Sequence, residues 1–303
     1  MAASGSRLVI YAAMIGNGLI AVTKLAAAGM TGSSAMLSEG IHSIVDTGNQ
    51  GLLLLGLKRA QRPPDERHPF GHGKEVYFWS FVVAIMIFGV GAGVSIFEGI
   101  RHVQHPKHID DPTINYVVLG LSFLFESVAW YLAWREFKRG VGKRTYLRAV
   151  QESKDPSTFV VLFEDSAAML GIIVAFLGIW LAQVTGHAWL DGAASIVIGL
   201  ILAGTAAWLA FETKGLLIGE SAAPAVVRGV RELAGSVDEV IAVHEVLTLH
   251  MGPEHILVTM NLDFRDDVPA ERVEAVSAEL KTTVKARWPK VSRVMVDAAA
   301  AVS

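Results

Sequence analysis

The chain of 303 residues contains no cysteine, which excludes both disulfide bonds and thiolate metal sites. Histidine, aspartate and glutamate are the strong metal ligands that remain. Charged residues make up only 18% of the sequence, against 52% hydrophobic residues, and the mean hydropathy is +0.44. Such a chain is too apolar for one soluble core, and its polar residues gather in a few places. The composition therefore indicates a membrane bundle with a water-soluble tail.

Several functional signatures are also missing from the sequence. It has no His-Glu-x-x-His arrangement and no nucleophile elbow, which argues against a hydrolytic enzyme. The tail has no basic stripe, so we expect no nucleic-acid partner. No removable signal peptide can be separated from the first apolar run.

Six apolar runs are long enough to cross a bilayer as helices, for which about 20 residues are needed. They are Leu8–Met30, Ala35–Leu57, Tyr77–Ile100, Ile114–Phe137, Ser157–Val184 and Ala188–Phe211. The first run contains Lys24, which could reach the interface by snorkelling or pair with a carboxylate such as Glu126. The sequence predicts an all-α, six-helix membrane domain over residues 1–218.

Basic residues in short loops indicate the orientation of these spans, because they favour the cytoplasmic side. The loops after the second and fourth runs are rich in lysine and arginine, whereas the opposite side offers only Arg101 and Lys107 in its longest loop. The basic residues in question are Lys58, Arg59, Arg62, Arg67, Lys74, Lys138, Arg139, Lys143, Arg144, Arg148 and Lys154. Both termini are therefore expected in the cytoplasm.

The character of the chain changes near Glu220. Helical spacing over Ala225–Val237 is followed by two runs rich in β-branched residues, Glu239–His250 and His255–Phe264. An amphipathic helix over Ala270–Trp288 and a last strand over Ser292–Asp297 complete the pattern. This order predicts a cytoplasmic αββαβ domain over residues 219–303, with helices on one face of its sheet.

Ionisable side chains inside the apolar runs are the first candidate site, since their burial in hydrocarbon is costly without a compensating ion or proton. His42 and Asp46 are four residues apart and share one helix face, close enough to ligate one metal ion. In the fifth run, Glu164 and Asp165 are adjacent, so they diverge by about 100° and only one can point directly at this pair.

Two loops and the tail contain further candidates. Asp65, His68 and His72 offer one carboxylate and two imidazoles within eight residues, a set suited to zinc. The outer-loop residues His102, His105, His108, Asp110 and Asp111 are predicted to be a solvated surface. In the tail, His244 and His250 are six residues apart in one predicted strand, so alternation predicts that they share a face.

Two segments carry a resemblance to a known family: GSSAMLSEGIHSIVD at 32–46 and PDERHPFGHG at 64–73. With these motifs, the chain resembles the cation diffusion facilitators, which transport divalent metals and include zinc transporters. The resemblance implies six spans, a metallochaperone-like cytoplasmic domain, a homodimer, and exchange of the metal for protons. It covers nearly the whole chain.

The resemblance also implies site residues. Two ligands on the second span and two on the fifth, four residues apart, would form the transport site, and His42, Asp46 and Asp165 match three of these positions. Val161 stands at the fourth and cannot ligate, so Glu164, water or another group would complete the shell, or three protein ligands would suffice. Asp65, His68 and His72 match a secondary loop site. His244 matches a tail ligand, although Asp297 stands where relatives carry histidine.

Together these observations predict a proton-coupled divalent-metal efflux transporter working by alternating access. Zn²⁺ suits one imidazole with carboxylates, while Fe²⁺, Mn²⁺ and Co²⁺ are tolerated by similar ligands. Two alternatives are a metal-binding membrane scaffold or sensor that does not transport, and an intramembrane metallohydrolase. A short, untargeted N-terminus favours a bacterial plasma membrane as the location.

Overall fold

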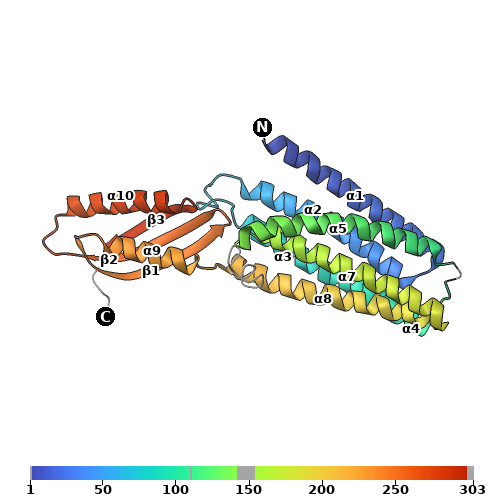
Figure 1. The fold of residues 1–303 in the computed structure, drawn as a ribbon. Coiled ribbons are helices and arrows are strands. Elements are labelled where there is room, and N and C mark those ends of the chain that lie inside the picture. The colour runs from blue at the N-terminus through green and yellow to red at the C-terminus, as the bar shows by residue number, and fades with distance from the viewer. Residues whose placement is uncertain (1, 110, 142–153, 299–303) are drawn as a thin grey trace. The chain divides into compact units, whose positions relative to one another are not determined.

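The computed structural model describes residues 2–109, 111–141 and 154–298, with side chains described from Gly16 onward except at residues 139–141, 157 and 158. Its first part is helical: α1 (Ala2–Thr31), α2 (Ser34–Ala60), α3 (Glu75–Met86), η1 (Ile87–Ala92), α4 (Gly93–Gln104), α5 (Thr113–Val141), α7 (Pro156–Thr185) and α8 (Trp189–Ile218). The tail contains α9 (Pro224–Gly235), β1 (Val240–Gly252), β2 (His255–Phe264), α10 (Ala270–Arg287) and β3 (Val291–Ala298) (Figure 1). Asp110 and the basic loop residues Lys143, Arg144 and Arg148 lie outside the described residues.

The chain forms two compact units. The first contains most of the length of the long helices, and the second contains the segment Leu57–Phe78 and the chain from Lys214 onward. The loop with Asp65, His68 and His72 therefore belongs to the same unit as the tail domain.

Each predicted span lies, to within one residue, inside a helical run of the structure, although several of the helices are longer than predicted. The largest differences are at α1, which begins six residues earlier, and at α8, which ends seven residues later. Two of the turns between helices depend on glycine. Gly32 between α1 and α2 has φ +73°, and Gly186 between α7 and α8 has φ +70°. A Cβ is strained at such angles, so glycine allows the chain to reverse there without loss of helix length.

In the part of the chain that the structure describes, four helical runs are long and apolar enough to cross a membrane. They are Glu75–Gln104, Thr113–Lys138, Phe159–Thr185 and Trp189–Ile218. The protein is thus a helical membrane protein, although α1 and α2 are not among these four. α2 is less apolar than these four runs because polar residues line one of its faces.

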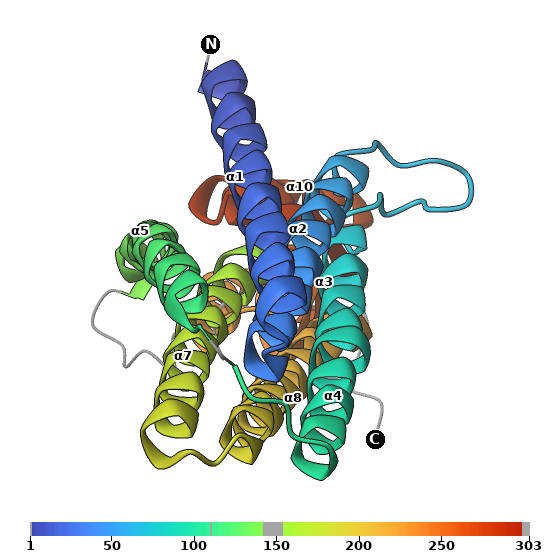
Figure 2. The same cartoon turned by 90° about the vertical axis from the view of Figure 1, so that its right-hand side faces the viewer.

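These polar residues of α2 are buried, which explains how a helix of modest hydropathy fits a membrane domain. Ser34, Ser38, Glu39, His42, Ser43, Asp46 and Asn49 are all buried. They contact other helices: Glu39 meets α1, Asn49 meets α7, and Ser38 meets Ser195 of α8. Figure 2 shows α2 beside α1 and α3 in this helical unit. The polar face of α2 therefore points into the protein.

The tail domain has the predicted αββαβ order. Its sheet has the strand order β1-β2-β3, with β1 and β2 antiparallel and β2 and β3 parallel. Residues of α9 and α10, including Val230 and Leu280, pack with Val258, Met260 and Leu262 in one apolar core. Both helices therefore cover the same face of the sheet, as predicted.

One prediction about this sheet is wrong. A β-bulge between Val243 and Glu245 adds an unpaired residue to β1, so the alternation of faces reverses at His244. Val243 packs against the core and His250 is buried, whereas His244 is exposed and therefore lies on the other face. Burial lowers the pKa of His250, which favours its neutral form.

Candidate metal sites

The His42–Asp46 pair lies on one face of α2, as its spacing predicts. Nδ1 of His42 and Oδ1 of Asp46 are 3.4 Å apart, and the His42 side chain is 1% exposed. Among the described residues, neither ring nitrogen of His42 nor Oδ1 of Asp46 has a hydrogen-bond partner. Buried polar atoms are almost always hydrogen-bonded, so three unpaired ligand atoms at one place indicate a site for a cation or protons.

The carboxylates of α7 lie opposite this pair. Asn49 of α2 donates a hydrogen bond of 2.7 Å to Oε1 of Glu164, while Gly171 leaves room for the Glu39 carboxylate. Contacts at 49–164 and 39–171 show that the two helices run antiparallel here. Residues 42–46 are therefore level with the α7 segment between Glu164 and Gly171, which includes Asp165.

Electrostatic contacts support the same arrangement. The carboxyl group of Asp46 interacts with those of Glu164, Glu126 and Asp165. Glu164 is buried, and Asp165 is partly buried. Carboxylates gathered near one imidazole are ligand types that bind divalent cations, which makes this group a candidate metal site.

The four predicted intramembrane ligands do not form a closed cluster in this conformation. Of the described residues, only Asp65, His68 and His72 bring three ligand atoms within 4.8 Å of one another. Glu164 points to Asn49, an interaction that the sequence analysis missed. Asn49 follows Asp46 by three residues and therefore lies on the same helix face, which is the signal in the sequence that marks it.

Lys24 has a definite partner in the structure. Its Nζ lies 3.0 Å from Oε2 of Glu39 and donates a hydrogen bond of 2.9 Å to Oγ of Ser43. Both charged side chains are 0% exposed. Of the two alternatives for Lys24, pairing with a carboxylate is confirmed, and the partner is a residue that sequence reasoning did not single out.

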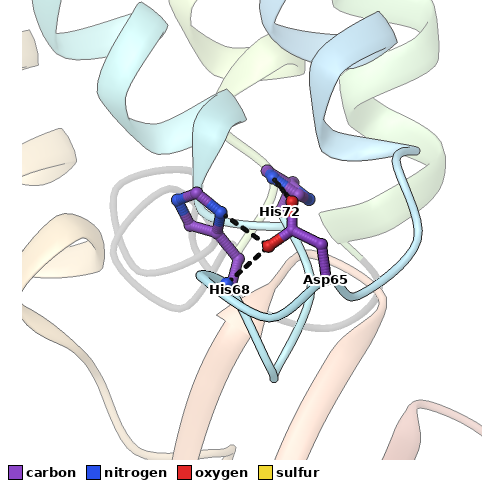
Figure 3. A group of neighbouring side chains, drawn as sticks. All are labelled: Asp65, His68 and His72. Carbon is purple, nitrogen blue, oxygen red and sulfur yellow. Dashed lines mark hydrogen bonds and ion pairs between the residues drawn. The ribbon is translucent and has the colours of Figure 1, made fainter.

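The loop site is the compact cluster of the second unit (Figure 3). Oδ1 of Asp65 lies 3.1 Å from Nδ1 of His68, and Oδ2 lies 3.5 Å from Nε2 of His72. The backbone N–H of His68 donates a hydrogen bond to Asp65, which lowers the pKa of that carboxyl group. The other ring nitrogen of His72, Nδ1, lies 3.2 Å from the carbonyl oxygen of Pro63. Such an outer contact orients a ligand for metal binding.

Contacts within the second unit hold this loop in place. The guanidinium of Arg293 lies 4.9 Å from the ring centroid of Phe70, a cation–π distance. Gly73 packs directly against Gly252 at the end of β1, with no room for a Cβ on either residue. The loop ligands are therefore supported by the tail domain.

The remaining histidines are less completely surrounded. Nε2 of His244 lies 3.7 Å from Oδ2 of Asp263, so the two residues together offer two ligand atoms. His105 and His108 are exposed as predicted, but His102 is buried, with Nε2 3.7 Å from Oδ2 of Asp191. The prediction of a wholly solvated outer cluster is thus wrong for His102.

Asp191 belongs to α8 and was not identified from the sequence. It accepts hydrogen bonds from Oγ of Ser33, at 2.7 Å, and from the backbone N of Ser34, at 2.5 Å. A carboxylate at this position accepts hydrogen bonds from N–H groups at the start of α2 that have no partner within the helix. Its negative charge also interacts favourably with the positive end of the helix dipole. These contacts identify Asp191 as a cap of the N-terminus of α2.

Comparisons with known proteins agree with these features. The family model described as "Cation efflux transmembrane domain" matches residues 10–218. The chain is 35% identical over 262 residues to the mouse protein "Proton-coupled zinc antiporter SLC30A9, mitochondrial", covering 86% of this chain and 46% of that protein. It is 28% identical to "Metal tolerance protein C4" of Arabidopsis thaliana, covering 86% and 56%. It is 24% identical to "Cation-efflux pump FieF" of Escherichia coli, covering 89% and 85%. The chain thus spans about half the length of the mouse and plant relatives.

Proposed function

Because the chain belongs to the cation efflux family of membrane transporters, we propose that it exports a divalent metal ion, Zn²⁺ first, in exchange for protons. Membership makes it a multi-pass transporter and not an enzyme. The observation that carries the finer proposal is the buried His42–Asp46 pair, in which both ring nitrogens of His42 and Oδ1 of Asp46 have no hydrogen-bond partner among the described residues. The mouse relative, which is named a proton-coupled zinc antiporter, gives the zinc and proton hypothesis further support.

The chemistry of exchange follows from the ligand types. Imidazole and carboxylate bind metal only when deprotonated, so metal and protons compete for His42, Asp46 and Asp165. We propose that Glu164 leaves Asn49 to complete the shell when metal binds, because Val161 cannot ligate. Fe²⁺, Mn²⁺ and Co²⁺ would fit similar ligands.

We propose that all six helical runs cross the membrane, with both termini in the cytoplasm. The family model includes the region of α1 and α2, and the buried polar face of α2 explains its lower hydropathy. The basic loops support the orientation. A bacterial plasma membrane remains our proposal for the location.

A transport assay with purified protein in sealed vesicles tests the proposed function. The vesicles contain a zinc-sensitive dye, and a pH gradient is imposed across the membrane. We expect zinc accumulation that depends on the gradient and collapses when a protonophore abolishes it. Tight zinc binding without flux would instead support the scaffold alternative.

The loop site provides a separate prediction, because we propose that Asp65, His68 and His72 bind one metal ion. Replacing Asp65 with asparagine removes the ligand charge but keeps the side-chain shape. We expect zinc affinity at this site to fall by at least about tenfold, measured by calorimetry in a background where Asp46 is also asparagine. Asp267→Asn, at an exposed turn, is the matched control, and equal affinities for the two variants would contradict the proposed site.

We propose residues 1–218 as the membrane domain and 219–303 as a regulatory domain that holds two protomers together. Leu247 and Met295 are exposed on the sheet face opposite α9 and α10. Both residues pair with Thr259 of the central strand β2, one from each side, so they lie at the same level of the sheet. An apolar pair on this face suits a symmetric contact. We expect Leu247→Ser with Met295→Ser to shift the purified protein from dimer towards monomer in light scattering. A parent protein that is monomeric at all concentrations would contradict the dimer.

A further inference from the structure

The Lys24–Glu39 ion pair is a second buried charge cluster that the proposed transport ligands do not include. The pair joins α1 to α2 at 3.0 Å, and Lys24 also donates to Ser43, the residue after His42. A buried ion pair is weak evidence for stability, since an apolar pair of similar volume often does as well. The pair therefore calls for a role beyond holding α1 against α2.

The Lys24–Glu39 pair lies between the proposed metal ligands and a cavity. Glu39 precedes His42 by three residues, so it is about one turn away on the same face of α2. On the other side of Glu39 is a cavity of about 730 Å³. It is lined by Leu25 of α1 and Leu37 of α2, and by polar residues at the end of α4, among them Glu98 and His102. Along α2, the order is cavity, Glu39, then His42 and Asp46.

The Glu39 carboxylate has one free oxygen. Lys24 binds Oε2, whereas Oε1 is buried and has no hydrogen-bond partner among the described residues. Oε1 faces Gly171 of α7, where the absence of a side chain makes room for the carboxylate. A cation moving from Asp46 towards the cavity would meet this free oxygen.

We propose that Lys24 and Glu39 form an ionic gate, in which the ammonium group occupies a cation station that the metal ion uses on its way between His42–Asp46 and the cavity. This inference rests on the proposed function. The divalent ion repels the ammonium and binds the carboxylate, while Ser43 keeps a hydrogen bond to Lys24 as it moves aside. In the conformation described here the gate is closed. Figure 2 shows α1 and α2 side by side.

The absence of cysteine from the chain makes the gate directly testable by thiol accessibility. Leu37→Cys reports the cavity, and Asp46→Cys reports the position behind the gate. Each variant is reconstituted in sealed vesicles without metal, and a membrane-impermeant methanethiosulfonate is applied to one side at a time. From the side that labels Leu37→Cys, we expect Asp46→Cys to react at least about tenfold more slowly, since open minor states are populated at 10% or less.

Removing both charges should open the gate. Lys24→Met with Glu39→Gln keeps the net charge, and we expect it to raise the labelling rate of Asp46→Cys from the cavity side by about tenfold or more. The matched control is Ser38→Ala with Ser195→Ala, which removes a hydroxyl pair of α2 and α8 in the same part of the helix. This control should leave the rate unchanged.

Two results would overturn the gate. One is equal labelling of Leu37→Cys and Asp46→Cys from the cavity side with the ion pair intact, a comparison that holds even if the double variant does not fold. The other is an unchanged Asp46→Cys rate in a double variant that elutes as a folded protein. Labelling needs no metal flux, so absence of transport with the expected labelling pattern would reject the proposed function and leave the gate standing.

Discussion

Replacing Asp46 with asparagine is expected to reduce zinc flux in sealed vesicles by about 100-fold or more, beyond the 10–100-fold loss that outer-shell contacts of a metal ligand cause. Asparagine keeps the shape of the side chain but removes the negative charge that a divalent ion needs in a dry site. Asp46 also interacts electrostatically with Glu164, Glu126 and Asp165. The substitution therefore removes the negative charge that these three carboxylates share as a neighbour. Flux is measured with the zinc-sensitive dye under a fixed pH gradient.

The matched control for this variant is Asp266→Asn, the same chemical change at an exposed turn of the tail domain. We expect its flux to equal that of the parent protein. A folded Asp46→Asn variant with parental flux would show that the metal passes elsewhere and would reject the proposed transport site.

Replacing Lys24 alone with methionine is expected to destabilise the protein by about 3–5 kcal/mol, because it leaves Glu39 as an unpaired charge in the interior. Both side chains are 0% exposed, so water cannot compensate for the missing ammonium. The measurement is thermal or denaturant unfolding of the protein in detergent, followed by tryptophan fluorescence.

Two further variants identify the cause of this loss. Lys24→Met with Glu39→Gln should recover most of the stability, because no buried charge is left without a partner. Lys107→Met removes a lysine that is exposed and should have little effect. If the single variant at Lys24 is as stable as the parent, the ion pair does not hold its charges in a dry interior.

Periodicity and residue type were sufficient for much of this protein. Apolar runs predicted the helices with ends that differ by at most seven residues, and runs rich in β-branched residues predicted β1 and β2. The His42–Asp46 pair needed no tertiary information either, because residues four apart on a helix always share a face. The trio of Asp65, His68 and His72 was found because its ligands are close along the chain.

Contacts between distant segments could not be read in the same way. The bulge at His244 depends on the register of β1 against β2, and one inserted residue was enough to put His244 and His250 on opposite faces. The partner of Lys24 was one of several carboxylates in the apolar runs, and only the packing of α1 on α2 selected Glu39.

The sequence by itself determined the helices, the αββαβ tail and the ligand types at the candidate sites, since these follow from local geometry and side-chain chemistry. The tertiary structure alone decided which polar atoms meet across helices: Glu164 with Asn49, Lys24 with Glu39, and Asp191 with the start of α2. The physical reason is that burial of a charge demands a partner, but its identity depends on how helices far apart in sequence pack together.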